Sequence, residues 1–402
     1  MQSLQHQPQT AEDVRDIVLD AVAQATPLAI EGTGTKHFLG KPVQAAATLS
    51  TAGLSGVTLY EPEELVLSAR AGTPMAEIEA VLKARGQRLE FEPLDYGPLL
   101  GQPAGQGTLG GVMSCNLSGP RRIKQGAARD HILGVGAVSG RGEIYKAGGR
   151  VVKNVTGFDL SKGLTGAYGT LSVLTDITIK VMPDSQSETT LLLRDMQDDE
   201  AMGALSAAMG SPGEVSAAAH LPYGVAGRVL DGALGKNAAT LMRLEGFGPS
   251  VKARAAHLGA ALEKVGRVER LEDDESRALW RDVRDVTPFA GPDHRVVWRL
   301  SVTPTRAADV VMALRMHIAA DALYDWQGGL VFLRLEHGVE AERIRAVIAA
   351  HGGGHATLLR ASMDERLTNP VFQPQPAALA ALSQRLKQQF DPVGILNPGR
   401  MG

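Results

Sequence analysis

Three glycine-rich turns in the first half of the chain constrain its fold more than any other feature. The first turn, 32–36, reads Gly-Thr-Gly-Thr-Lys and follows the short apolar segment 28–30. The second, 105–111, leads into a predicted helix whose first amides we expect to be unpaired; the third, 163–170, precedes a predicted strand. Glycine lets the backbone approach a ligand closely and leaves amides free to bind anions. The pattern therefore predicts a cradle for the two phosphates of a dinucleotide.

The second turn also matches the G-x-G-x-x-G pattern of Rossmann dinucleotide-binding folds, and Asp130 follows at a spacing that suits a ribose carboxylate. Its context excludes this interpretation, because Pro98 and Pro103 interrupt the segment where a strand should precede the motif. Gly119-Pro120 then ends the following helix too early for a crossover connection. A P-loop nucleotide site is excluded as well, since no G-x-x-x-x-G-K-[ST] run occurs.

Length, charge and cysteine content narrow the function further. The 402 residues favour two domains, and a net charge of -3 offers no basic field for nucleic acid. Cys115 is the only cysteine, so the chain has no internal disulfide and cannot supply four thiolates to an iron–sulfur cluster. No apolar run reaches the ~20 residues that span a bilayer, and residues 1–26 lack a signal-peptide pattern. We expect a cytoplasmic protein that meets the inner face of the cytoplasmic membrane only peripherally or through a partner.

The order of predicted elements indicates an α+β fold in three parts. Residues 1–183 are expected to form two small α+β subdomains, divided near residue 60, that clasp the ligand between them. Residues 184–365 predict a ferredoxin-like α+β cap with split βαβ topology, and residues 366–402 predict a helix and tail that return to the first part. Helices are expected after a Thr10 cap, after Thr73-Pro74, and at 251–262, 306–319 and 378–389, with cap strands at 239–244, 295–302, 329–335 and 356–361.

Longer motifs connect these turns to a known family. The segments 107–119, 148–170 and 390–401 resemble the vanillyl-alcohol-oxidase type of FAD-binding protein. The runs Gly-Pro-Arg-Arg (119–122), Val-Lys-Asn-Val-Thr-Gly-Phe-Asp-Leu-Ser (152–161) and Gly-Gly-His-Ala-Thr (353–357) are similar to those of the FAD-binding E subunit of bacterial glycolate oxidase. This resemblance covers nearly the whole chain. It implies a PCMH-type FAD-binding domain, a second FAD subunit and an iron–sulfur subunit as partners, and a small 2-hydroxy acid as the substrate of the complex.

The turns and the resemblance together select the residues expected to hold FAD. They are Gly32, Thr33, Gly34, Thr35, Lys36, Gly107, Thr108, Leu109, Gly110, Gly111, Ser114, Asn116, Gly119, Pro120, Lys153, Asn154, Gly166, Gly169, Thr170 and Leu174. The FAD is expected to be noncovalent, because Thr35 stands where covalent members of the superfamily carry a linking histidine. His37 is interpreted as a loop histidine near the phosphates and Cys115 as a small buried side chain. No metal site is expected.

The polar residues around the turns leave two interpretations open. Arg121 and Arg122 follow a Gly-Pro stop beside the second turn, where they either serve a site or interface or remain solvated. Lys153, Asn154 and Asp159 fall in a predicted buried segment, where they either approach the isoalloxazine or form an internal hydrogen-bond network.

The catalytic residues are unknown from the sequence. Oxidation of a 2-hydroxy acid needs a base for the hydroxyl proton and a cation for the carboxylate. Arg299 and His355 are the best candidates, but the closely spaced histidines of catalytic relatives are missing, which favours a structural His355. Three hypotheses remain: an FAD subunit that relays electrons in a complex, a self-sufficient dehydrogenase whose cap supplies Arg299, His355 or Tyr324, and a redox-inert scaffold subunit.

Overall fold

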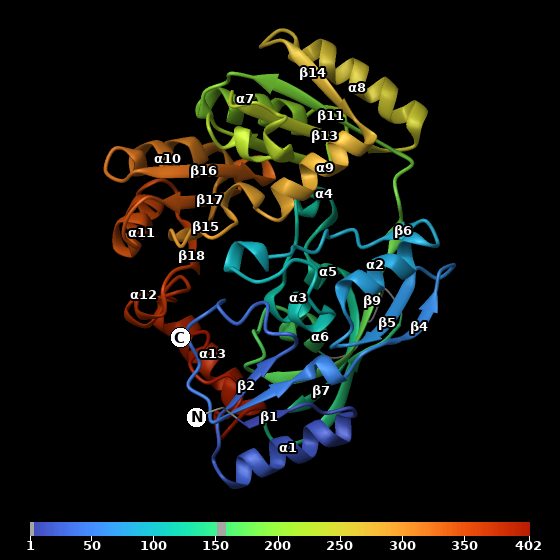
Figure 1. The fold of residues 1–402 in the computed structure, drawn as a ribbon, viewed down its shortest axis with the longest axis vertical. Coiled ribbons are helices and arrows are strands. Elements are labelled where there is room, and N and C mark those ends of the chain that lie inside the picture. The colour runs from blue at the N-terminus through green and yellow to red at the C-terminus, as the bar shows by residue number, and fades with distance from the viewer. Residues whose placement is uncertain (1–3, 151–157) are drawn as a thin grey trace.

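The N-terminus forms a small parallel sheet in the computed structural model, which describes residues 4–150 and 158–402 (Figure 1). Its strands lie in the order β1 (Leu4–His6), β3 (Ala47–Ser50) and β2 (Leu28–Glu31). Helix α1 (Ala11–Ala23) packs beside this sheet and buries Val14 and Val18. It begins at Thr10 as predicted, because the Thr10 hydroxyl accepts from the Asp13 amide and the Asp13 carboxylate accepts from the Thr10 amide.

A second, antiparallel sheet of five strands completes the N-terminal region, by which we mean residues 4–150 and 158–183. Its order is β4 (Val57–Glu61), β5 (Val66–Arg70), β9 (Ser172–Lys180), β7 (Ile132–Ser139) and β8 (Ile144–Gly148). Short helices accompany it: α2 (Met75–Lys83), α3 (Leu109–Cys115), α4 (Arg122–Gln125), α5 (Ala128–His131) and α6 (Leu160–Leu164). The two-residue strands β6 (Gln87–Arg88) and β10 (Met182–Pro183) pair at its edge. The expected division of this region near residue 60 falls within β4, so the two subdomains stay a prediction.

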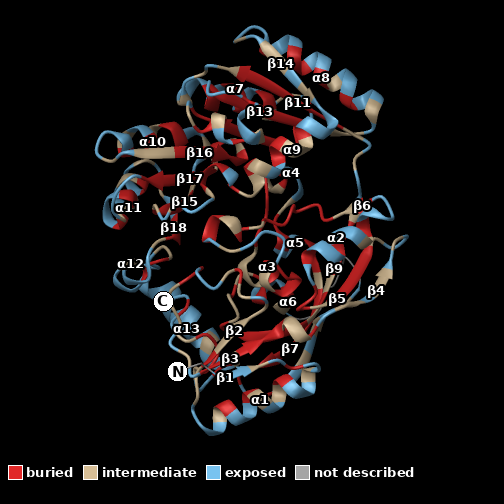
Figure 2. Ribbon diagram, in the orientation of Figure 1, coloured by how far each residue is buried: buried red, intermediate tan, exposed pale blue. Residues whose placement is uncertain are grey.

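The cap contains one antiparallel sheet of eight strands, buried along most of its length (Figure 2). Its order is β14 (Val268–Glu272), β11 (Ser187–Arg194), β13 (Ala239–Gly246), β12 (Ala217–Leu221), β16 (Ala320–Asp325), β17 (Leu330–Leu335), β15 (Val297–Val302) and β18 (Gly354–Arg360). Each half has the βαββαβ order of a ferredoxin-like unit. The expected ferredoxin-like cap is therefore built from two such units, joined where His220 of β12 pairs with Tyr324 of β16.

The two faces of the cap sheet have different neighbours. Helices α7 (Asp198–Met209), α8 (Gly248–Leu262), α10 (Ala307–Arg315) and α11 (Ala341–Ala350) contribute to a core on one face. Side chains on the other face, such as Leu323 and Phe332, join one continuous core with the N-terminal region and α9 (Asp273–Arg284). Helix α10 ends at Arg315 and not near 319 as predicted, because β16 begins at Ala320. Because the two parts share this core, the cap packs directly against the N-terminal region.

The C-terminal segment returns to the N-terminal region after α12 (Met363–Thr368) and α13 (Ala377–Phe390) (Figure 1). The Asp391 carboxylate accepts hydrogen bonds from the amides of the next turn, and Leu396 then pairs with Leu28 of β2. The α+β class is confirmed, whereas the domain boundaries near 183 and 365 stay predictions. Within the described residues, no helix has the length and apolar character needed to cross a membrane.

Candidate functional site

The first glycine turn carries a set of backbone amides with no partner. Strand β2 ends at Glu31, and the chain then turns through Gly34, whose φ is +79°. Within the described part of the chain, the amides of Thr33, Gly34, Thr35 and Lys36 donate no hydrogen bond. Amides of this kind bind anions in turns of many proteins. The expectation of an anion-binding turn thus agrees with the geometry.

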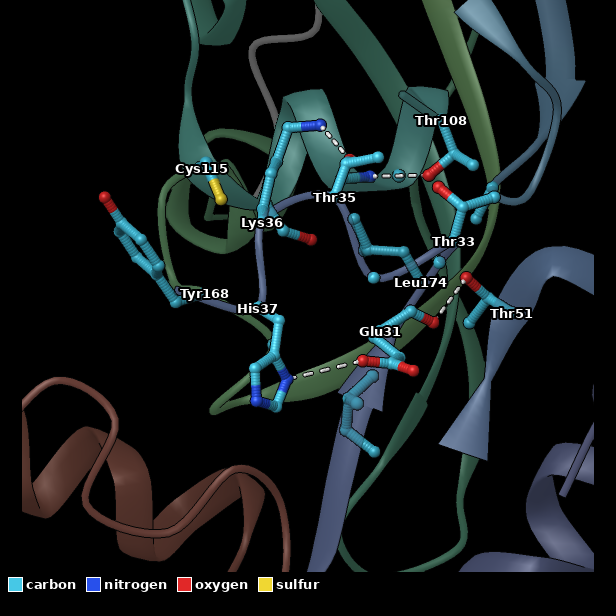
Figure 3. A pocket seen from close by; sticks show the side chains of 18 of the residues that line it. Glu31, Thr33, Thr35, Lys36, His37, Thr51, Thr108, Cys115, Tyr168 and Leu174 are labelled. Carbon is cyan, nitrogen blue, oxygen red and sulfur yellow. Dashed lines mark hydrogen bonds and ion pairs between the residues drawn. The ribbon is translucent and has the colours of Figure 1, made fainter. Parts of the chain in front are cut away.

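These amides border a cavity that is partly open to solvent (Figure 3). Its walls come from β2 and the first turn, from α3, from the segment around Gly169, and from the C-terminal tail. Of the residues predicted to bind FAD, the cavity is lined by Gly32, Thr33, Gly34, Thr35, Lys36, Thr108, Gly110, Gly111, Ser114, Gly169 and Leu174.

Lys36 supplies a half-buried positive charge to this cavity. Its Nζ lies 3.3 Å from the Thr35 Oγ1 (Figure 3), and a Cβ added at Gly107 would lie 3.3 Å from the same nitrogen. Burial lowers the pKa of Lys36, while the neighbouring Cys115 and Asp95 raise it in part. No carboxylate of the described residues forms an ion pair with it. A bound anion would remove this destabilisation of the charged form.

The second turn differs from the prediction in how its amides are used. The Leu109 amide donates to the Thr73 carbonyl oxygen at 3.0 Å, and the Gly110 amide donates to that of Ala71 at 2.7 Å. The prediction that the first amides of this helix are unpaired was wrong, because the turn is held against the segment that follows β5. A Cβ on Gly110 would lie 2.8 Å from the Ala71 carbonyl oxygen, so close backbone packing explains that glycine.

The third turn is joined to the first by the C-terminal tail. The Asn397 Oδ1 accepts from the Ile30 amide at 2.9 Å, and its Nδ2 donates to the Tyr168 carbonyl oxygen at 2.8 Å. Gly169 follows with a φ of +67° and lines the cavity. Arg400, three residues after Asn397, also lines the cavity. The tail therefore closes the site from a distant part of the sequence.

Several residues predicted to bind FAD do not line the cavity: Gly107, Leu109, Asn116, Gly119, Pro120, Gly166 and Thr170. Leu109 is fully buried in the core. The side-chain oxygen of Asn116 accepts a hydrogen bond from the Arg129 amide at 3.1 Å. The Gly119 carbonyl oxygen accepts from Trp326 Nε1 at 3.0 Å, which connects it with the cap. Lys153 and Asn154 lie outside the described residues.

Other lining residues were absent from the predicted set: Ile30, Glu31, His37, Thr51, Ala71, Cys115, Tyr168, Ser172 and Arg400. The His37 Nδ1 lies 3.7 Å from a Glu31 carboxylate oxygen. Burial raises the pKa of the Cys115 thiol, whereas Lys36 and Arg400 lower it in part. Most of these residues come from segments adjacent to the glycine turns. Arg400 lies in the segment 390–401, whose resemblance to FAD-binding proteins could have identified it.

The three cap candidates occupy different positions. Arg299 of β15 pairs with Thr357 of β18 in the sheet. His355 lies in β18, two residues before Thr357. His355 is exposed, whereas Arg299 is half-buried, with its Cζ 5.2 Å from the centre of the Trp326 ring. Tyr324 lies in the core formed with the cap helices, and its hydroxyl donates to Asp198 at 2.6 Å. Tyr324 therefore does not face the N-terminal region. The hypothesis of a self-sufficient dehydrogenase had placed its side chain over the flavin.

The two arginines of the Gly-Pro-Arg-Arg run have separate environments. Arg121 is buried and forms ion pairs with Glu92 at 3.2 Å and Glu245 at 2.6 Å, so it belongs to the interface between the N-terminal region and the cap. Arg122 is half-buried, and its Cζ lies 4.4 Å from the centre of the Trp326 ring. Neither side chain lines the cavity.

Comparison with known proteins identifies the family of this chain and its cofactor. A family model described as an FAD binding domain matches residues 4–148. The chain is 36% identical to glycolate oxidase subunit GlcE of Escherichia coli strain K12, over 96% of this chain and 95% of that protein. Glycolate oxidase subunit GlcD of Bacillus subtilis strain 168 is 26% identical over 46% of this chain and 38% of that protein. The p-cresol methylhydroxylase structure superposes on 99% of this chain and 88% of its own, with a TM-score of 0.73 at 14% identity. The chain therefore belongs to the family of FAD-binding oxidoreductase subunits represented by the glycolate oxidase subunit GlcE.

Proposed function

We propose that this chain is an FAD-binding subunit of a multi-subunit glycolate oxidase, which converts glycolate to glyoxylate and passes the electrons to an iron–sulfur partner. The observation that carries the proposal is the cavity of the first turn, where four free amides lie beside the Lys36 ammonium. The 36% identity with GlcE over nearly the whole chain supports the same type of enzyme.

The residues of this cavity fit the diphosphate of FAD. The amides of 33–36 are neutral donors, and Lys36 supplies a positive charge that no described carboxylate neutralises. Leu174 and Tyr168 add apolar surface to the same cavity. The cofactor would be held without a covalent bond. When bound, FAD supplies an acceptor for the hydride that leaves the hydroxyl-bearing carbon of the substrate.

The partners follow from the relatives and from the cysteine content. GlcE and GlcD are both named as subunits of glycolate oxidase, so we infer a second FAD subunit similar to GlcD. The single Cys115 leaves iron–sulfur chemistry to another chain. Contact with the inner face of the cytoplasmic membrane would be peripheral or made by a partner. In the preferred role, the FAD of this chain relays electrons or supports the complex while the sister subunit removes the hydride.

An anaerobic flavin spectrum of the purified chain tests this role. Glycolate is added first and a chemical reductant second, and the absorbance of oxidised flavin is followed. Bleaching by the reductant alone is the result expected of a relay that depends on its partners. Bleaching by glycolate would instead establish a self-sufficient dehydrogenase, and a chain without flavin would support the redox-inert scaffold. A Lys36→Met variant serves as the control for occupancy of this cavity.

A further inference from the structure

Two arginine side chains stack on the same indole ring between the N-terminal region and the cap. The Arg122 Cζ lies 4.4 Å from the centre of the Trp326 ring, and the Arg299 Cζ lies 5.2 Å from it. Trp326 is 9% exposed, and its Nε1 donates to the Gly119 carbonyl oxygen at 3.0 Å. The ring is thus fixed to both parts of the molecule, and it holds one cation from α4 beside one from β15.

Neither guanidinium has an anionic partner within residues 4–150 and 158–402. The hydrogen bonds and ion pairs of that part of the chain include none between a carboxylate and the side chain of Arg122 or Arg299, although the adjacent Arg121 pairs with Glu92 and Glu245. Burial lowers the pKa of Arg122, and the charge of Arg299 lowers it further. Two half-buried cations that repel each other favour the binding of an anion between or beside them.

A buried hydroxyl lies in the same place. Tyr96 is 1% exposed, and its hydroxyl donates no hydrogen bond to the described residues. Burial raises the pKa of Tyr96, and the Arg299 guanidinium lowers it in part, through its charge and as a hydrogen-bond donor. A buried hydroxyl proton without an acceptor is energetically costly, so a ligand that accepts its hydrogen bond would be stabilised.

The acid beside these groups is a weak counter-ion. Asp325 is 2% exposed and accepts a hydrogen bond from the Trp326 amide at 2.7 Å. Burial raises the pKa of Asp325 to about 7, and Arg299 lowers it only in part. The carboxyl is therefore protonated in a large fraction of molecules at neutral pH.

The charge of Arg299 reaches a side chain that lines the FAD cavity. Tyr168 lines the cavity, and its pKa is raised by burial and by Cys115 and lowered by the charge of Arg299. Arg299 therefore acts on a side chain that borders the cofactor site.

We infer that Arg299 and Arg122, held by Trp326, form a carboxylate-binding site for a small 2-hydroxy acid in this chain itself. The substrate carboxylate pairs with Arg299 and accepts from the Tyr96 hydroxyl, and Arg122 adds a second positive charge. The choice of 2-hydroxy acid rests on the proposed function, whereas the anion site rests on the geometry. The chain would then bind substrate directly, even when the sister subunit removes the hydride.

The test is a calorimetric titration of the FAD-loaded full chain with glycolate and, separately, with ethylene glycol, which lacks the carboxylate. Glycolate should bind and ethylene glycol should not. Arg299→Gln should weaken glycolate binding by about tenfold to a hundredfold, the usual effect of one charged hydrogen bond. Arg122→Gln should weaken it less. Arg129→Gln, which changes an exposed arginine one helix away, should leave it unchanged.

FAD content is measured in every variant, so that a failure of this inference is distinguished from a failure of the proposed function. Unchanged glycolate affinity in an FAD-loaded Arg299→Gln chain overturns the carboxylate site, as does a wild-type chain that binds no glycolate at about 10 mM. If Arg299→Gln loses FAD, Tyr96→Phe, which removes one oxygen atom, takes its place under the same criterion. A wild-type chain without FAD would refute the proposed function, and arginine-dependent glycolate binding by that chain would still support this site.

Discussion

Replacement of Glu92 by glutamine should loosen the contact between the N-terminal region and the cap. The Glu92 carboxylate accepts hydrogen bonds from Arg243 Nη1 at 2.8 Å and Nη2 at 3.0 Å, and Arg243 lies in β13 of the cap. It also accepts from the Arg121 backbone amide at 2.8 Å. Although burial opposes ionisation, Arg121 and Arg243 lower the pKa of Glu92 from 4.5 to about 2. Glutamine keeps the size of the side chain and removes the charge.

The pKa difference sets the size of the effect. A lowering of about 2.5 corresponds to about 3 kcal/mol of folding free energy, and breaking a buried ion pair costs about 3–5 kcal/mol. Because the folded pKa of Glu92 is lowered, this stabilisation is fully present above a pH of about 4.5 and is lost as the pH falls toward 2. Glu92→Gln should therefore reduce the free energy of unfolding by about 3 kcal/mol at pH 7 and by much less near pH 3.

Urea unfolding at several pH values measures both quantities. Glu63→Gln is the matched control, since Glu63 is exposed and makes no ion pair within the described chain. We expect this control to change the unfolding free energy by less than about 0.5 kcal/mol. The reasoning is refuted if Glu92→Gln behaves like the control at pH 7, or if its effect is the same at pH 7 and pH 3.

Three other substitutions test the cavity and the buried acid. Lys36→Met removes the cation beside the free amides and should weaken FAD binding by about tenfold to a hundredfold, as measured by flavin fluorescence. Asp325→Asn should raise the unfolding free energy by up to about 4 kcal/mol at pH 8 and hardly at pH 4. Burial raises the pKa of Asp325 from 3.8 to about 7, so the ionised carboxyl destabilises the folded protein as the pH rises through that window. Equal melting-temperature shifts at both pH values would contradict this. Gly110→Ala brings a methyl group within 2.8 Å of the Ala71 carbonyl oxygen and should cost about 1–3 kcal/mol, whereas Gly163→Ala, with no atom within 4 Å, should not; calorimetric unfolding that fails to separate the two would argue against the close packing.

Local signals in the sequence predicted the elements of the fold well. Thr10 caps the first helix through its own hydroxyl, and the alternation of residues 239–244 and 329–335 marks strands that the structure contains. These features depend on residues a few positions apart, so they are readable from the chain. The junction of the two ferredoxin-like units was not, because it depends on pairing between His220 and Tyr324, more than a hundred residues apart.

The sequence by itself predicted FAD, through the resemblance of its motifs to a family, and it located the first glycine turn. The amides of residues 33–36 find no partner among the described residues, because a short glycine-containing turn leaves its backbone donors unpaired. Only the tertiary structure decided that the amides of the second turn are paired with the segment after β5. It also decided that Arg400 lines the cavity and that two arginine side chains stack on Trp326. Each of these outcomes is a contact between distant segments, which neither the spacing nor the composition of either segment records.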